Sequence, residues 1–221
     1  ASAPSGVEYR DNIIVGNHKK ITSLDPQAFA QVDTGHISLM THEPLVHYLS
    51  ATGEYLPKLA TSWEISKDGL TYTFHLREGV KFHDGNTFTA DDVVFTINRG
   101  LKDGVATVKD LYKQFAAFTA KDDRTVEVVL KRPNLDLLIS MANTGAFGIL
   151  SRKAVEADET KGPTIGTGLW KNKEFVSGDY VLLERNNAYW GGTTPTKTIR
   201  FRYIPEASAR LIALETGKID V

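Results

Sequence analysis

Alternating hydrophobic and polar residues between positions 59 and 99 predict strands, tight turns and one helix. Tyr72, Phe74 and Leu76 fall on one face of an extended segment, and the residues between them are polar, as in a half-buried antiparallel strand. Trp63 and Ile65 alternate with polar neighbours in the same way and predict a preceding strand. Turns are predicted at Ser66-Lys67-Asp68-Gly69, Glu78-Gly79 and Asp84-Gly85, because glycine adopts backbone angles closed to other residues.

A helix is predicted to follow these turns. Thr89 with Asp92 three residues later is typical of a helix N-terminus, where free N–H groups and the helix dipole favour negative charge. Val93, Val94 and Ile97 are expected to point inward. Gly100 is predicted to end the helix.

The rest of the chain contains further strand and helix patterns separated by turns. A buried strand is predicted at 12–16, and a helix from about residue 37 that stops before Pro44. Hairpins are predicted at 115–120 with 125–130 and at 169–175 with 180–185. The other expected elements are a helix or loop at 106–114, helices at 135–141, 152–158 and 206–216, a strand at 199–203 and the start of a strand at 219–221. Lys161-Gly162-Pro163 is predicted to be a crossing between domains.

Composition and charge narrow the class of protein. A chain of 221 residues with 41% hydrophobic and 24% charged residues is typical of a globular protein of one or two domains. A net charge of −1 gives no general attraction to nucleic acid or to anionic membranes, so neither is predicted as a partner. The sequence has no cysteine, which excludes disulfides, thiolate metal sites and cysteine nucleophiles within it.

Residues 59–93 also match a longer pattern without gaps. It runs LA-x-SW and then DG-x-x-Y-x-F-x-LR-x-GVKF-x-DG-x-x-F-x-A-x-DV. This pattern closely resembles the signature of the family 5 extracytoplasmic solute-binding proteins, the receptors of dipeptide, oligopeptide and nickel ABC importers. Later stretches agree with the family: Ile165-Gly166-Thr167-Gly168, Asn186-Asn187-Ala188-Tyr189-Trp190-Gly191-Gly192 and Phe201-Arg202-Tyr203-Ile204-Pro205.

The resemblance implies a mixed α/β (α+β) fold of the periplasmic-binding-protein-like type II class. It implies that the chain corresponds to the N-terminal lobe with an inserted small β-rich domain, and that the family's C-terminal lobe is missing from it. We place domain I at residues 1–37 and 164–221, and the inserted domain II at residues 38–163. Because the family is exported, the resemblance implies a periplasmic or cell-surface protein, often lipid-anchored through a cysteine that would lie upstream of residue 1.

The loop after the first predicted strand contains the candidate ligand-binding residues. Asn17, His18, Lys19 and Lys20 follow that strand, at the edge where a sheet presents loops to ligands. The resemblance implies that this loop lines the ligand cleft, where its cationic groups would suit a peptide carboxylate or another anion. A solvated basic loop is the alternative. Phe29 joins the candidate set because it keeps an aromatic ring at a position that the resemblance aligns with the chelate-holding residues of nickel receptors.

No metal site is predicted. His36, His42 and His47 are close in sequence, but their spacings match no compact metal-binding pair, and surface or helix-capping positions are expected for them. The other positions that the resemblance aligns with the nickel chelate site lack the required groups: Gly35, Val108 and Gly148.

Three residues near the C-terminus are assigned structural roles. Tyr189 and Trp190 are expected to pack within the lobe, with an aromatic ligand wall as the alternative. Arg210 is expected to pair with a carboxylate.

The sequence contains no G-x-S-x-G, no S-x-x-K and no phosphate-binding glycine loop, so no catalytic residue and no cofactor is predicted. The leading hypothesis, which rests on the resemblance, is a non-enzymatic receptor that captures short peptides or similar small solutes and delivers them to the membrane permease of an ABC importer. One alternative keeps the fold and binds a nickel or other metal chelate, haem, glutathione or an oligosaccharide. Another is a sensor that uses the receptor fold.

Overall fold

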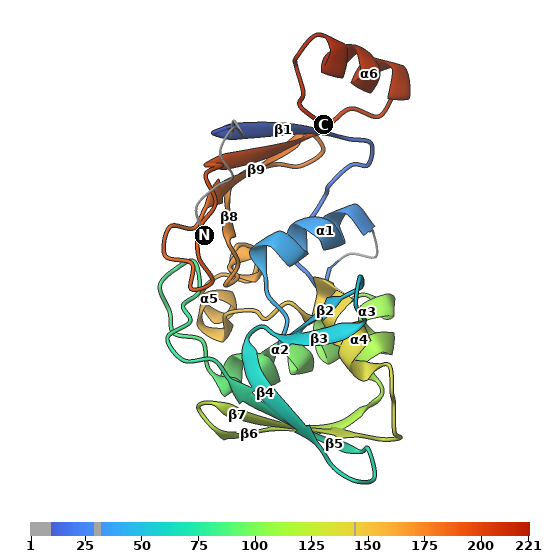
Figure 1. The fold of residues 1–221 in the computed structure, drawn as a ribbon, viewed down its shortest axis with the longest axis vertical. Helices are drawn as coiled ribbons and strands as arrows, with labels where there is room; N and C mark the ends of the chain where they lie inside the picture. The colour runs from blue at the N-terminus through green and yellow to red at the C-terminus, as the bar shows by residue number, and fades with distance from the viewer. Residues whose placement is uncertain (1–9, 29–31, 144) are drawn as a thin grey trace. The chain divides into compact units, whose positions relative to one another are not determined.

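Residues 10–28, 32–143 and 145–221 are described by the computed structural model (Figure 1). The chain divides into two compact units. The first unit consists of the chain up to Thr22 together with Leu169–Val221, and the second unit is Ser23–Gly168. The domain boundaries at 37 and 164 stay a prediction. The compact units differ from them by grouping residues 23–37 and 164–168 with the inserted segment.

The first unit is built on a four-stranded mixed sheet with the strand order β1-β10-β9-β8. Its strands are β1 (Asn12–Asn17), β8 (Trp170–Val176), β9 (Tyr180–Arg185) and β10 (Thr198–Tyr203). β1 runs parallel to β10, whereas β10, β9 and β8 are antiparallel neighbours. The predicted β8–β9 hairpin is confirmed, and its turn contains Gly178 with a φ of +78°, a conformation that favours glycine.

Helix α6 (Ala207–Glu215) and the residues that follow it lie past the β1 edge of this sheet (Figure 1). The N–H groups of Asp220 and Val221 donate to the carbonyl oxygen of Ile14 at 2.7 and 3.3 Å, and the N–H of Gly16 donates to Val221 at 2.8 Å. This is the bonding pattern of a parallel pair, so the predicted strand start at 219–221 does pair with β1. It is too short to form a regular strand.

The prediction for Arg210 is wrong. Its guanidinium donates to the carbonyl oxygens of Ile204 and Pro205 at 2.8 and 2.7 Å, instead of pairing with a carboxylate. Arg210 stands in the first turn of α6, from which its side chain reaches back to the carbonyl groups before the helix. The rings of Tyr189 and Trp190 contact each other with centroids 5.4 Å apart. The packing role of the pair within the lobe stays a prediction.

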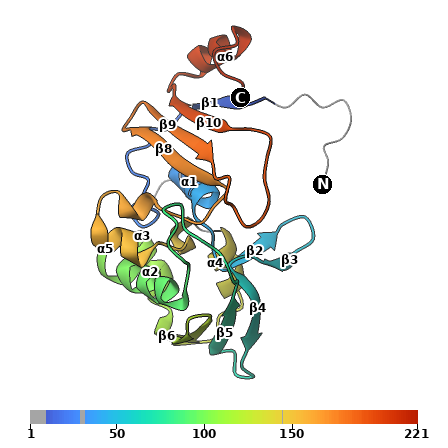
Figure 2. The ribbon, with the colours of Figure 1, turned by 90° about the vertical axis from the view of Figure 1, so that its left-hand side faces the viewer.

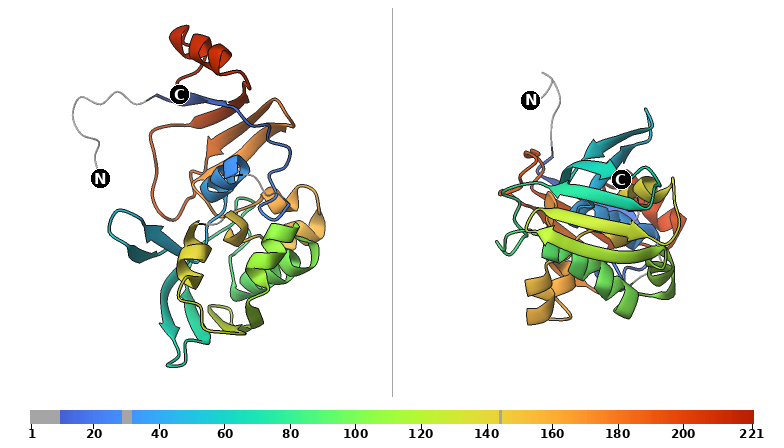
Figure 3. Two further views of the ribbon diagram at one scale, coloured as in Figure 1. Left: turned by 90° about the vertical axis from the view of Figure 1, so that its right-hand side faces the viewer. Right: turned by 90° about the horizontal axis from the view of Figure 1, so that it is seen from below.

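The second unit contains a four-stranded antiparallel sheet with the order β4-β5-β7-β6. Its strands are β4 (Ala60–Ile65), β5 (Thr71–Leu76), β6 (Phe115–Asp122) and β7 (Thr125–Leu130). The predicted alternation is confirmed, because Tyr72, Phe74 and Leu76 are buried on one face of β5. Figure 3, in the view from below, shows these strands side by side, with the green helices of the same unit on one side of them.

Helix α2 (Ala90–Asp103) begins where the sequence predicts it. The N–H of Thr89 donates to the Oδ2 atom of Asp92 at 2.9 Å, which completes the predicted N-terminal cap. The prediction that Gly100 ends the helix is wrong, because α2 continues to Asp103. Gly100 instead makes room for a buried ring: a Cβ atom at this position would lie 2.0 Å from Cε2 of Tyr112.

The second unit also contains an antiparallel hairpin, β2 (Val46–Leu49) and β3 (Glu54–Pro57), which stands out from the rest of the unit in Figure 2. The predicted helix before Pro44 is present as α1 (Val32–Thr41). The remaining helices are α3 (Ala106–Tyr112), α4 (Leu137–Asn143) and α5 (Arg152–Ala157), with short 3₁₀ helices η1 (Gly145–Phe147) and η2 (Gly162–Thr164). Within the described ranges, no helix combines the length and the apolar character that a membrane crossing requires.

Candidate functional site

The loop that follows β1 lies at the edge where two parallel strands end. Asn17 at the end of β1 is in register with Tyr203 at the end of β10. The N–H of Ile204 donates to the carbonyl oxygen of Asn17 at 2.8 Å, and the Asn17 side-chain amide donates to the carbonyl oxygen of Lys19 at 3.0 Å. These bonds fix the start of the loop, and the side chains of residues 18–20 are exposed.

Lys20 packs against the β8–β9 turn. A Cβ atom at Gly178 would lie 2.1 Å from Cε of Lys20, so the absence of a side chain at Gly178 leaves room for the lysine. The N–H of Gly178 also donates to the carbonyl oxygen of Ile21 at 3.0 Å. Lys20 therefore helps to anchor the loop to the turn.

A small cavity lies beside this loop, within the first unit. Its volume is about 10 Å³, and it is lined by Asn17, Lys19, Ile21, Asp179, Tyr180, Phe201 and Tyr203. A cavity of this volume holds about one water molecule. The loop and the sheet edge therefore offer polar groups to a ligand, but they do not enclose one.

The structure brings together two of the predicted ligand-binding residues, Asn17 and Lys19, at this cavity. His18 and Lys20 are on the same loop but do not line the cavity. Phe29 lies outside the described residues. Ligand binding by these residues stays a prediction.

Sequence reasoning missed the residues that the β8–β9 turn and β10 contribute to the same cavity. Among them, Tyr180 has the guanidinium of Arg200 4.5 Å from its ring centroid. A hydrogen bond to Glu174 raises the pKa of Tyr180. The turn glycine before Asp179 predicted the hairpin, but the parallel pairing of β1 with β10, which brings these positions together, has no local signal in the sequence.

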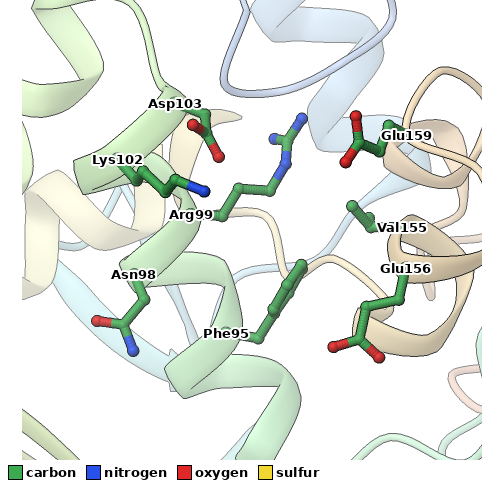
Figure 4. Close-up of a pocket in the computed structure, with 8 residues that line it drawn as sticks. All are labelled: Phe95, Asn98, Arg99, Lys102, Asp103, Val155, Glu156 and Glu159. Carbon is green, nitrogen blue, oxygen red and sulfur yellow. The ribbon is translucent and has the colours of Figure 1, made fainter.

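A larger groove lies in the second unit, between α2 and α5 (Figure 4). Its volume of about 560 Å³ falls in the range of small-molecule sites. Figure 4 shows the side chains of α2 on one side of the groove and those of α5 and the following turn on the other. The lining residues are Phe95, Asn98, Arg99, Lys102, Asp103, Val155, Glu156 and Glu159.

The charges that line this groove are partly neutralised within the protein. The guanidinium of Arg99 donates to both carboxylate oxygens of Asp25 at 3.1 and 2.6 Å, and to the side chain of Gln27 at 2.8 Å. Glu156 pairs with Arg152 at 2.8 Å. No sequence motif marks this groove, because it arises from the packing of two helices that are far apart in the chain.

A buried carboxylate that forms an ion pair lies just after α1. Glu43 is only 2% exposed, and its carboxylate is 3.0 Å from the ammonium of Lys58. The hydroxyl of Thr167 donates to the same carboxylate at 3.0 Å. A buried carboxylate needs such partners, because its desolvation costs several kcal/mol by order of magnitude.

His42, next to this ion pair, is fully buried. A surface position is therefore wrong for His42, but the capping alternative fits, because its N–H donates to the carbonyl oxygen of Ser38 at 2.6 Å just after the end of α1. His36 and His47 are exposed. Burial, together with the charge of His83, lowers the pKa of His42 to about 3, so the ring is neutral near pH 7. The described residues include no group of three or more histidine, aspartate and glutamate side chains placed to hold a metal ion.

Two of the positions aligned with the nickel chelate site lie in the interior. Val108 is 2% exposed, and a Cβ atom at Gly148 would lie 2.6 Å from the Cβ of His42. Neither position offers a ligating side chain to a solute.

The architecture described above is found in solved structures of transport receptors. DppA from Helicobacter pylori, an ABC transporter-associated periplasmic binding protein in complex with the peptide STSA, is 29% identical with a TM-score of 0.84. NikA from Brucella suis, in complex with Fe(III)-EDTA, is 32% identical with a TM-score of 0.84. The alignments cover 94% of this chain and 45% and 42% of those chains. The fold is therefore the mixed α/β fold of the type II periplasmic binding proteins.

Sequence comparison identifies the family within this class. The family description "Bacterial extracellular solute-binding proteins, family 5 Middle" matches residues 54–221, so the chain belongs to this family. The dipeptide-binding protein of Escherichia coli is 31% identical over 234 residues, covering 90% of this chain and 42% of that protein. The nickel-binding periplasmic protein of E. coli is 34% identical over 226 residues, covering 100% of this chain and 41% of that protein. The chain thus spans about two fifths of the length of these relatives.

Proposed function

We propose that this protein is a receptor of an ABC importer that captures short peptides outside the cytoplasm and delivers them to a membrane permease. The observation that carries the proposal is the fold match, at a TM-score of 0.84 over 94% of the chain, to a protein in complex with a peptide. The 31% identity to the E. coli dipeptide-binding protein supports the same class of ligand. A receptor of this kind binds its solute without altering it, which makes the proposed role non-enzymatic.

The loop after β1 is proposed to form one wall of the solute site, through Asn17, His18, Lys19 and Lys20. Phe29 stays a further proposed ligand-binding residue, outside the described residues. The small cavity of about 10 Å³ beside this loop supports a site that is completed by another part of the protein. A C-terminal lobe would supply the opposite wall, in agreement with the greater length of the relatives. In the proposed domain organisation, residues 1–37 and 164–221 form one domain around the inserted residues 38–163.

Capture between two lobes has a clear physical basis. A solute enclosed between them loses contact with water, which strengthens each hydrogen bond and ion pair that it makes with the protein. Hinge bending to a closed form is then favoured by binding, and the closed form is a shape that a permease can recognise. The proposed location is periplasmic or at the cell surface, in agreement with relatives that are described as periplasmic.

A second candidate is a receptor for a metal chelate with the same fold. The 34% identity to the nickel-binding protein of E. coli and the fold match to NikA with Fe(III)-EDTA favour it. The interior positions of Val108 and Gly148 argue against it, because a buried valine and a glycine offer no side-chain group that could hold a chelate. Haem is a further ligand of this candidate class, since a haem-binding protein of Haemophilus influenzae is 29% identical.

Calorimetry and thermal unfolding of the full-length protein distinguish these candidates. Di- and tripeptides are added in one series, and nickel with histidine in another. A peptide at 100 times its Kd stabilises a single-site receptor by about 2.7 kcal/mol, which shows as a higher Tm. Heat and stabilisation with peptides support the first candidate. A response to the chelate alone supports the second and contradicts the first.

Substitutions test the proposed wall. Asn17→Ala and Lys19→Ala should weaken peptide binding, with the larger loss for peptides whose carboxylate approaches the loop. Lys67→Ala is the matched control, because Lys67 is exposed on the β4–β5 turn of the other unit. Equal affinities for all three variants and the unchanged protein would remove the loop from the site.

A further inference from the structure

The segment Gly166-Thr167-Gly168 is buried, although it is neither helix nor strand. It is the last part of the second unit, and the chain passes into the first unit at Leu169. Buried backbone without regular structure needs specific hydrogen-bond partners, because an unpaired buried N–H or C=O group is costly. The partners of this segment therefore determine how the chain leaves the second unit.

His83 supplies most of these partners. Its ring Nδ1 lies 3.2 Å from the N–H of Gly166, and its ring Nε2 lies 2.9 Å from the carbonyl oxygen of Gly168. Its backbone N–H donates to the carbonyl oxygen of Gly166 at 2.9 Å. One residue thus binds both glycines of the segment, with its main chain and with both ring nitrogens.

The two ring contacts define the protonation state of His83. The Gly166 N–H is a donor, so Nδ1 must accept with its lone pair. The Gly168 carbonyl is an acceptor, so Nε2 must carry the proton. Only the neutral tautomer with the proton on Nε2 satisfies both contacts. A second proton on Nδ1 would face the Gly166 N–H and abolish that bond.

The other side of the segment is held by the end of α1. The N–H of Gly168 donates to the carbonyl oxygen of Thr41 at 2.9 Å. The approach is close, because a Cβ atom at Gly166 would lie 2.0 Å from the Thr41 oxygen and one at Gly168 would lie 2.4 Å from the Met40 oxygen. The segment is therefore confined between α1 and His83.

We infer that His83 is a positioning residue: its three hydrogen bonds keep Gly166-Thr167-Gly168, the last residues of the second unit, in place. Protonation of its Nδ1 atom would break the bond to the Gly166 N–H and loosen this segment. The inference goes beyond the proposed function, because it concerns the fold and holds for any solute. It predicts that the segment Gly166-Thr167-Gly168 loosens when the pH falls far enough for the His83 ring to take up a second proton.

Other titratable groups lie around the segment. His42 packs against Gly166, where a Cβ atom would lie 2.8 Å from His42 Cδ2, and its pKa of about 3 keeps it neutral above pH 5. Glu43 accepts the hydroxyl of Thr167 and pairs with Lys58. Asp84 follows His83 in its own turn, and its carboxylate is bound by Asn86.

Two measurements on the full-length protein test the inference. Nitrogen NMR of the His83 ring at pH 7.5 should show the proton on Nε2. Amide hydrogen exchange should show a protection factor for Gly166 and Gly168 that falls at least about tenfold between pH 7.5 and pH 5. The protection factor is used because it corrects for the intrinsic pH dependence of exchange.

Variants separate this role from a general packing role. His83→Gln should lower the protection at pH 7.5 and remove its pH dependence. His47→Gln, at an exposed histidine of β2, should behave like the unchanged protein. A proton on Nδ1 at pH 7.5, or protection that does not change with pH in the unchanged protein, would overturn the inference. Both of these results come from the unchanged protein, so they test the inference even if His83→Gln does not fold.

Discussion

The two units of this chain differ in how they use their hydrophobic residues. The second unit buries large side chains completely, among them Phe74, Tyr112 and Leu137 with 0% exposure. In the first unit, α6 leaves Leu211, Ile212 and Leu214 56%, 58% and 47% exposed. Burial of apolar area drives folding, so the second unit has the stronger hydrophobic drive within its own residues.

Polar groups show the same contrast. In the Glu43–Lys58 pair of the second unit the carboxylate is buried, whereas the ion pair of Lys197 with Asp11 in the first unit is exposed on both sides. Exposed ion pairs add little stability, about 0–1 kcal/mol. We expect the second unit to be the more stable of the two, and the first unit to depend more on what contacts it.

The largest test of this contrast truncates one core residue in each unit. Phe74→Ala in β5 should lower the free energy of unfolding by about 3–5 kcal/mol, and Leu183→Ala in β9 by about 2–5 kcal/mol, because both side chains are fully buried. Calorimetry with residue-resolved hydrogen exchange should assign each loss to the unit that carries the change. If both variants shift one shared transition by their full amounts, the two units unfold together and the contrast fails.

Acid should destabilise the second unit through His42. The unfolded chain binds a proton at this residue below about pH 6.5, whereas the folded protein does so only near pH 3. The unfolded state therefore binds more protons between these two pH values. As the pH falls, the free energy of unfolding decreases by about 1.4 kcal/mol per pH unit, or by about 2–3 kcal/mol from pH 6.5 to pH 4.5.

The His42 contribution is measured by difference, because other groups also titrate in acid. Denaturant unfolding of the unchanged protein is compared with His42→Leu at several pH values, and His36→Leu serves as the exposed control. The variant at position 42 should lose this part of the pH dependence. Parallel curves for the unchanged protein and His42→Leu would show that His42 is protonated when folded.

Gly100→Ala tests the packing inside the second unit, with a smaller expected change in the free energy of unfolding. Alanine favours a helix interior by about 0.5–1 kcal/mol over glycine, so helix propensity alone predicts a gain. The ring of Tyr112 opposes this gain, since it is fully buried, 4.9 Å from the ring of Phe147, and would meet the new methyl group. We expect a net loss of about 1–3 kcal/mol in denaturant unfolding. Asn98→Ala, on the exposed face of α2, should cause no loss.

The elements with local signals could be predicted from the sequence. The alternation in β5, the cap formed by Thr89 and Asp92, and the turn at Gly178 depend on residues that are neighbours in the chain. The family and the fold class could be predicted as well, because the pattern around residues 59–93 is long and local.

Most of the errors and omissions involve distant partners. Arg210 is the exception, because its guanidinium binds the nearby carbonyl groups of Ile204 and Pro205. Gly100 was assigned to the end of a helix because its partner, the Tyr112 ring, comes from the next helix. A surface or helix-capping position was expected for His42, and its burial was missed because it depends on Gly148 and Gly166, more than a hundred residues away. In the candidate site, Asn17 and Lys19 could be found from the end of a strand, but Tyr180 and Tyr203 could not, because β1 meets β10 only in the folded sheet.

The smallest expected effect on folding comes from the exposed helix of the first unit. Leu211→Gln in α6 should change the free energy of unfolding by about 0.5 kcal/mol or less, because the side chain is 56% exposed.

The effect of Leu211→Gln on association between chains should be larger. Apolar side chains gathered on one exposed helix favour contact with another molecule, so the 221-residue chain should associate at high concentration. Sedimentation velocity over a concentration series should show less association for Leu211→Gln. Leu135→Gln is the matched control in the second unit, since Leu135 is 94% exposed but stands outside any helix. If the chain is a monomer at every concentration, or if the two substitutions have equal effects, α6 does not form an association surface. The two units would then differ only in their cores.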